Sequence, residues 1–250
     1  MEKRPILVQG AMIIEVKNII DALSDLHEES IGQWKFYCGN LNGYPVVVSK
    51  TEMGMVNASA ATVLGIERYS PIAIINQGTA GGHDKKLRKY DVIIGNESIN
   101  IGSYRSDFKE EGAGVNPSDW IPMKTSVVIE GRVRRMFSFK SDETLVNLAI
   151  KASERYTKGN TYVGCLASAD QWNKELDRLV YFNTNIKSLG EDMETAACNQ
   201  IAMGYKIPFL GIRVVSNNEH HLEVFAKDSS DYSQEFTIYV LEEYIKSLSI

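Results

Sequence analysis

Two kinds of apolar pattern alternate along the chain and indicate its secondary structure. Short runs rich in β-branched residues predict strands at 5–9, 34–41, 44–49, 72–76, 161–168 and 209–216, with another inside 91–101. Apolar residues at helical spacing predict helices at 13–26, 56–69, 142–156, 174–182, 194–204 and 233–247. The pair Asn42-Gly43 predicts a hairpin between two of the strands. This alternation predicts an α/β protein with a mixed or parallel sheet covered by helices.

The segment from Gly102 to Lys140 differs from the rest of the chain. It is rich in Gly, Ser, Asp and Lys, carries scattered aromatic residues, and is longer than an ordinary connection between two elements. We expect it to be an insertion that acts as a lid or as a contact between subunits. Nothing else in the sequence indicates a linker, so we predict a single domain over 1–250 with a variable insertion at about 102–140.

Composition narrows the classes of function. The 250 residues are 44% apolar and 24% charged, which is enough chain to bury a sizeable core. The net charge of −5 disfavours a nucleic-acid partner, because binding to a phosphate backbone needs clustered Lys and Arg. The short basic run at 132–135 is interpreted as a solvated face.

Cysteine usage and hydropathy predict where the protein works. The three cysteines, Cys38, Cys165 and Cys198, have unrelated spacings and form neither a paired motif nor a metal-ligand pattern. No apolar stretch approaches the length of a membrane span, and the N-terminus is too polar for a secretory signal. We therefore predict a cytoplasmic protein with no metal site, no cofactor and no membrane partner.

Polar residues of similar kinds are found at four predicted strand ends. The segments are GAMIIE at 10–15, NQGTAGG at 76–82, EDMETAA at 191–197 and IRVVSNN at 212–218. In open α/β sheets, ligands bind beyond the carboxyl ends of strands. The glycines of the turn that we expect at 77–82 would also let the backbone approach a ligand closely. These segments therefore predict where a ligand binds.

In this order, the four motifs resemble the 5′-methylthioadenosine/S-adenosylhomocysteine nucleosidase family of the purine nucleoside phosphorylase superfamily. The similarity includes GMVNA at 54–58 and LASAD at 166–170, so it extends from the N-terminus to the last helix and omits the 102–140 insertion. The resemblance implies a three-layer phosphorylase/hydrolase-like fold whose central mixed, twisted sheet is flanked by helices. It also implies a homodimer that hydrolyses the N-glycosidic bond of a small purine nucleoside.

Two carboxylates carry the chemistry that this resemblance implies. Cleaving a ribosyl bond builds positive charge on the sugar and negative charge on the departing base, so anions are needed near the sugar and donors near the base. The resemblance makes Glu15 the general acid/base that activates water, and Glu194 the carboxylate that binds the ribose hydroxyls. For each, the alternative is a glutamate that stabilises the start of a helix through its dipole.

Further matched positions are expected to contact the substrate or the water: Arg213, Met193, Thr79, Gly81, Trp172, Ser216, Met12 and Met53. Arg213 could instead form a structural ion pair with Glu191 or Asp192, since a buried arginine needs a partner. Met193 would pack against the ribose and Trp172 would stack on the purine, but both could also be core residues. The glycine-rich turn could likewise be an ordinary tight turn.

One position departs from the family pattern. Adenine-specific nucleosidases of the family carry an aspartate that protonates the leaving base, and this chain has Asn217 there. An amide cannot deliver a proton, although it can donate a hydrogen bond. The 6-oxopurine phosphorylases of the superfamily use asparagine in that way. Weak activity, hypoxanthine or guanine as the base, or another leaving group therefore stay open.

The arginines that hold phosphate in the phosphorylases of the superfamily have no evident match. The segment GAMIIEV has no basic residue before Lys17, and Glu52 lies where it would hinder an anion. Hydrolysis is therefore favoured over phosphorolysis. Two alternatives remain, a purine nucleoside phosphorylase and a nucleoside-binding protein whose catalysis is weakened at Asn217.

Overall fold

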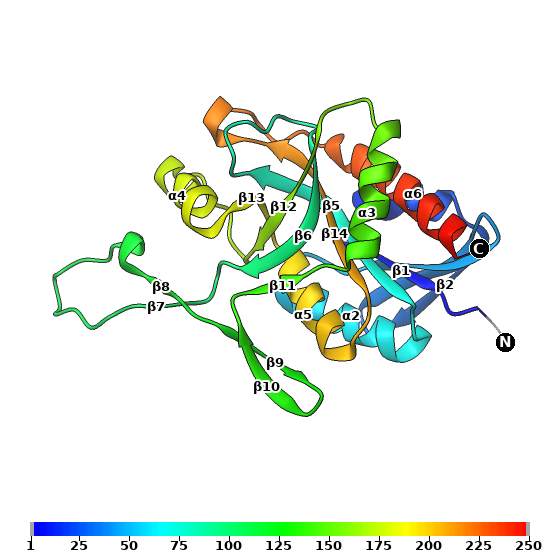
Figure 1. Cartoon of the computed structure of the whole chain (residues 1–250), viewed down its shortest axis with the longest axis horizontal. Helices are drawn as coiled ribbons and strands as arrows, with labels where there is room; N and C mark the ends of the chain where they lie inside the picture. The colour runs from blue at the N-terminus through cyan, green and yellow to red at the C-terminus, as the bar shows by residue number, and fades with distance from the viewer. Residues whose placement is uncertain (1–2, 249–250) are drawn as a thin grey trace.

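The computed structural model describes residues 3–248, and its centre is a ten-stranded mixed sheet (Figure 1). The strands are β1 (Ile6–Gly10), β2 (Ser24–Ile31), β3 (Trp34–Leu41), β4 (Tyr44–Lys50), β5 (Ala73–Gly82), β6 (Val92–Asn100), β11 (Ser138–Lys140), β12 (Thr161–Ser168), β13 (Ser188–Asp192) and β14 (Phe209–Asn217). Their order is β11-β6-β12-β13-β5-β1-β4-β3-β2, and β14 pairs with both β5 and β6. The predicted α/β class with a central mixed sheet is confirmed.

Helices cover both faces of this sheet. Three of them, α1 (Ile13–Asp21), α3 (Glu143–Ala152) and α6 (Ser229–Ser247), pack together on one face, and α2 (Met55–Tyr69) and α5 (Thr195–Tyr205) pack on the other (Figure 1). Strand residues alternate between the two resulting cores, so that Leu7 faces α2 and α5 whereas Val8 faces α1 and α6. Among the described helices, none combines the length and apolar content that a membrane crossing requires.

The sheet closes into a ring at β5. From β5 the pairing runs through β14, β6, β12 and β13, and β13 then returns to β5. The closing contact is short and places Gly81 and Gly82 opposite Glu191 and Gly190. A Cβ on Gly190 would lie 2.7 Å from the backbone oxygen of Gly81, so the close approach of the two strands requires glycine there. As a result, the ends of β5, β13 and β14 lie at one place.

The 102–140 segment extends from the body and then rejoins the sheet. The short strands β7 (Tyr104–Arg105) and β8 (Ile121–Pro122) pair with each other, and β9 (Thr125–Ile129) and β10 (Arg132–Met136) form a hairpin that points away from the sheet (Figure 1). The basic run lies on β10 with its arginines exposed. The segment returns to the sheet at β11, which pairs with β6.

Three sequence predictions are wrong or incomplete. The helix predicted at 13–26 ends at Asp21, and residues 24–31 form the edge strand β2. Most of β2 is exposed, so its sequence lacks the apolar alternation that marks a strand. The turn predicted at 77–82 is the final part of β5, because pairing with β14 and β13 keeps it extended. The strand end expected at 191–197 is that of β13, but the range of this strand is not predicted because it is short and partly polar.

The buried position of β5 gives a test of the fold. The side chain of Ile75 is 0% exposed and lies in the core between β5 and the helices α1 and α6. Replacing it with alanine should lower the free energy of unfolding by about 2–5 kcal/mol, because the substitution leaves a cavity. Ile150→Ala removes the same atoms from α3, where the side chain is 43% exposed, and should cost less than about 1 kcal/mol. Urea denaturation measures both, and equal losses would contradict this placement of β5.

Candidate active site

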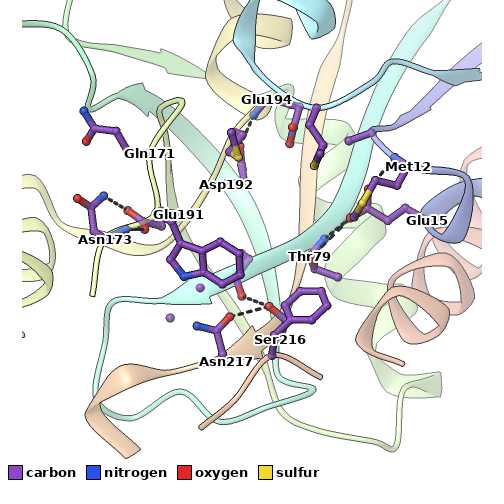
Figure 2. Close-up of a pocket in the computed structure, with 18 of the residues that line it drawn as sticks. Met12, Glu15, Thr79, Gln171, Asn173, Glu191, Asp192, Glu194, Ser216 and Asn217 are labelled. Carbon is purple, nitrogen blue, oxygen red and sulfur yellow. Dashed lines mark hydrogen bonds between the residues drawn. The ribbon is translucent and has the colours of Figure 1, made fainter. Parts of the chain in front are cut away.

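A cavity of about 420 Å³ opens where β5, β13 and β14 end (Figure 2). The segments that follow β1, β4 and β12 complete its wall. The predicted site residues that line it are Met12, Glu15, Met53, Thr79, Gly81, Trp172, Met193, Glu194, Ser216 and Asn217. Arg213 lies behind the wall and is 1% exposed. The fold thus brings the strand-end motifs together around one space.

Glu15 enters the cavity from the first turn of α1. Its Oε2 accepts the backbone N–H of Met12 at 3.1 Å, and its Oε1 accepts the backbone N–H and the hydroxyl of Thr79 at 3.1 and 3.4 Å. A Cβ on Gly78 would lie 2.8 Å from Oε1, so glycine makes room for the carboxylate. Burial raises the pKa of Glu15 above its ordinary value, while Arg213 and these hydrogen bonds oppose the rise. A buried carboxyl whose pKa is raised in this way is suited to exchange a proton with a neighbouring group.

Glu194 faces the same cavity from the residue before α5. Its Oε1 accepts the backbone N–H of Gly54 at 3.0 Å, and its Oε2 lies 3.6 Å from Nη2 of Arg213. Burial and the negative charge of Asp192 raise the pKa of Glu194 to about 8, and Arg213 offsets only part of that rise. The charge of Glu15 also contributes to the raised pKa, so the two glutamates interact across the cavity.

Arg213 and Asp192 hold Glu194 in position. Nε of Arg213 lies 3.2 Å from Oδ2 of Asp192, and both side chains are 1% exposed. Oδ1 of Asp192 accepts the backbone N–H groups of Glu194 and of the next residue at 2.7 and 2.8 Å, which caps the start of α5. Of the two ion-pair partners considered for Arg213, the structure therefore shows Asp192. Glu191 points elsewhere, and Glu194 is the additional partner.

Asn217 lies at the end of β14, on another side of the cavity (Figure 2). Its Oδ1 accepts the hydroxyl of Ser216 at 2.9 Å, and its Nδ2 donates to Oε1 of Glu219 at 3.5 Å. The neighbouring Asn218 has a structural role, because its amide donates to backbone oxygens of the loop that contains Leu87. Of these two asparagines, Asn217 is therefore the one that lines the cavity.

A second polar cluster lines the cavity, and sequence reasoning did not find it. Glu191 accepts the backbone N–H of Asn173 at 2.9 Å and its side-chain amide at 2.6 Å (Figure 2). Nε2 of His83 lies 3.2 Å from Oε2 of Glu191, and its Nδ1 lies 2.7 Å from the hydroxyl of Ser188. The one signal in the sequence is the pair of acidic residues before Met193, since no motif marks the histidine or the asparagine.

The mouth of the cavity is partly apolar. Trp172 is 62% exposed, and its ring lies edge-on to that of Phe225 with the centroids 6.3 Å apart. A second cavity of about 550 Å³ shares the 171–173 segment and extends between the β7–β8 region and α4 (Leu176–Tyr181). Within residues 3–248, no group of three or more His, Cys, Asp and Glu side chains could hold a metal ion.

Comparison with known proteins places the chain in a family. The model for the family described as the phosphorylase superfamily matches residues 5–246. The chain belongs to the phosphorylase superfamily. A relative in the superfamily, the 5′-methylthioadenosine/S-adenosylhomocysteine nucleosidase of Tolumonas auensis, is 29% identical over 235 residues, which cover 88% of this chain and 93% of the relative.

Solved structures similar to this superfamily member agree in fold. A nucleosidase of the same name from Neisseria meningitidis, in complex with methylthio-immucillin-A, has a TM-score of 0.78 at 24% identity over 96% of this chain and 99% of its own. The futalosine hydrolase of Helicobacter pylori has a TM-score of 0.78 at 20% identity over 96% of this chain and 98% of its own.

The raised pKa of Glu194 predicts how the stability of this phosphorylase-superfamily chain depends on pH. Its pKa is about 8 in the folded protein against an ordinary value of 4.5, so the stability from this group is complete below 4.5 and is lost as pH rises through 8. Glu194→Gln has no proton to lose and should lose less stability than the wild type between about pH 5 and pH 9. Denaturant titrations at both pH values measure this, and parallel losses would show that Glu194 is ionised throughout.

Proposed function

We propose that the chain is a nucleosidase that hydrolyses the N-glycosidic bond of a purine nucleoside of the 5′-methylthioadenosine/S-adenosylhomocysteine type, releasing the free base and a ribose derivative. The observation that carries the proposal is that two buried carboxylates, Glu15 and Glu194, line one cavity. Their charges suit a sugar that becomes cationic in the transition state. The similarity of the Tolumonas auensis nucleosidase along most of the chain supports hydrolysis as the reaction.

The arrangement divides the reaction among three groups. Glu15 takes a proton from a water whose oxygen bonds to C1′, while the bond from C1′ to the base breaks and leaves its electron pair on the base. Glu194 accepts hydrogen bonds from the ribose hydroxyls. These hydrogen bonds favour the ionised form of Glu194 and so offset the burial that raises its pKa. Asn217 donates a hydrogen bond to the base, which takes its proton from solvent because an amide has none to give.

The side chains near the mouth suit an apolar substituent on the 5′ carbon. Met53 is 57% exposed and Phe225 is 40% exposed, and both line the cavity. Thioether sulfur makes favourable contacts with aromatic rings, and methionine side chains adapt to apolar groups of different shapes. A thio-substituted ribose would therefore place its substituent on these groups while its hydroxyls reach Glu194.

The charges around the cavity favour water over phosphate as the nucleophile. Lys227, which is exposed, is the one lysine or arginine among the described residues that line the cavity. The guanidinium of Arg213 is occupied by Asp192 and Glu194. A phosphate dianion would meet two carboxylates without a free guanidinium to bind it, so phosphorolysis is disfavoured.

Glu15→Gln tests the role of the general base. Glutamine keeps the size of the side chain but cannot take a proton from water, so kcat should fall by roughly 10²–10⁴-fold with little change in KM. The matched control is Glu130→Gln, which makes the same change at an exposed residue between β9 and β10 and should leave the rate unchanged. Steady-state assays of base release measure both variants, and a near wild-type rate for Glu15→Gln would remove Glu15 from the mechanism.

Phosphate dependence separates the proposed reaction from its alternatives. Base release by the purified protein should proceed over many turnovers in phosphate-free buffer, and added phosphate should not accelerate it. A strict requirement for phosphate, with a ribose phosphate as product, would identify a phosphorylase. Binding of purine nucleosides without turnover in either buffer would identify a binding protein.

We also propose that the protein is a homodimer and works in the cytoplasm. The 102–140 segment carries exposed apolar side chains, including Phe108 at 87% and Val115 at 81%, that a second subunit would cover. Cys38, Cys165 and Cys198 are all free thiols, which fits a reducing compartment. Light scattering coupled to size-exclusion chromatography tests the dimer, and a monomer at micromolar concentration would contradict it.

A further inference from the structure

Three residues on three neighbouring strands form the floor of the cavity on the side where we expect the nucleobase to bind. Gly81 of β5 is in register with Asn217 of β14 on one side and with Glu191 of β13 on the other. A Cβ placed on Gly81 would lie 3.8 Å from Nδ2 of Asn217 and 3.8 Å from Cγ of Glu191. The amide and the carboxylate therefore flank one open platform that has no side chain of its own.

Asn217 presents a hydrogen-bond donor to this platform. Its Oδ1 is turned to the hydroxyl of Ser216, and its Nδ2 is turned away from that hydroxyl (Figure 2). Glu219 fixes this orientation, because the reversed amide would place its oxygen 3.5 Å from a carboxylate oxygen. The group that faces the space above Gly81 is consequently an N–H donor.

Glu191 presents an acceptor on the opposite side. A carboxylate has about four acceptor positions and, when ionised, no donor. Two of these positions are taken by the N–H groups of Asn173, and Nε2 of His83 lies 3.2 Å from Oε2, which leaves a further position unfilled. The remaining position belongs to a carboxylate that is 8% exposed and lines the cavity, so a base bound there can fill it with one N–H.

We propose that this platform selects a 6-oxopurine base, hypoxanthine or guanine, over adenine, an inference that rests on the proposed nucleosidase function. Along one edge of the two fused rings, a 6-oxopurine places the acceptor O6 between the acceptor N7 and the donor N1–H. The N–H of Asn217 that does not point to Glu219 can then be shared between N7 and O6, and Glu191 accepts from N1–H. Adenine has an acceptor at N1, so a carboxylate facing that atom would be repelled.

Adenine could instead point its 6-amino group at Glu191. Its hydrolysis is then disfavoured because adenine is the poorer leaving group in this site. A purine that leaves with the electron pair of the broken bond must spread or neutralise negative charge. A 6-oxopurine spreads that charge onto O6, where a hydrogen bond from Asn217 stabilises it. Adenine lacks this oxygen and depends more on protonation of its ring, which an amide cannot supply.

The test compares two nucleosides that differ only at position 6, 5′-methylthioinosine and 5′-methylthioadenosine. The wild type should have a kcat/KM roughly 10- to 100-fold higher for the 6-oxo compound. Asn217→Asp restores a proton donor to the base and should raise hydrolysis of 5′-methylthioadenosine, so that the preference falls or reverses. Glu191→Gln can donate to N1 of adenine as well as accept from N1–H, and should reduce the preference from the other side.

Controls keep the outcomes separate. Glu130→Gln should retain the wild-type preference, and inhibition of the wild type by free hypoxanthine and free adenine reports base recognition even if Glu191→Gln does not fold. Preferential hydrolysis of 5′-methylthioadenosine by the wild type, together with tighter binding of adenine, would overturn this inference and leave the nucleosidase standing. Absence of hydrolysis of either nucleoside by both the wild type and Asn217→Asp would instead overturn the proposed function.

Discussion

One buried guanidinium compensates two buried carboxylates, and the placement of the site depends on it. Asp192 and Glu194 flank the junction of β13 and α5, and Arg213 comes from β14. Each ion costs several kcal/mol to bury unless a partner of opposite charge lies against it. The two strands are separated by β5 in the sheet, so this compensation holds only while the ring through β5 is closed. The charge cluster and the ring are therefore mutually dependent.

Arg213 offsets only part of the negative charge of the buried carboxylates, and the proposed reaction can use this incomplete compensation. Burial raises the pKa values of both cavity glutamates above their ordinary range, and Arg213 offsets only part of the rise. For Glu194, the negative charges of Asp192 and Glu15 raise the pKa further. Hydroxyl groups from a sugar would donate further hydrogen bonds to Glu194. The free energy of binding can thus be used to ionise Glu194 at the moment when a cationic sugar benefits from it. If the charge cluster were fully neutralised, substrate binding would no longer be coupled to the ionisation of Glu194.

The sequence could predict the parts of the site that are local in the chain. GAMIIE places Glu15 in the first turn of a helix, and the apolar run before Arg213 makes a buried strand whose arginine needs a partner. What it could not predict depends on pairing between distant strands. The contact of Glu191 with His83 arises because β13 meets β5 over two residue pairs, and no local pattern encodes that register. The exposed edge strand β2 was missed for the opposite reason, since its stability comes from backbone pairing with β3 and not from apolar side chains.

Side chains alternate in direction along β13, and this separates the side chains proposed to contact the base from those proposed to act at the sugar. Neighbouring strand residues point to opposite faces, so Glu191 turns to Asn173 and His83 while Asp192 turns to Arg213 and the start of α5. In the proposed reaction, the first residue belongs to the base platform and the second to the charge cluster that faces the sugar. A substitution at Glu191 changes which hydrogen bonds a base can make without removing an ion pair from Arg213. Because the two sets of contacts share a strand but no side chain, this fold can change its base while keeping the chemistry at the ribose.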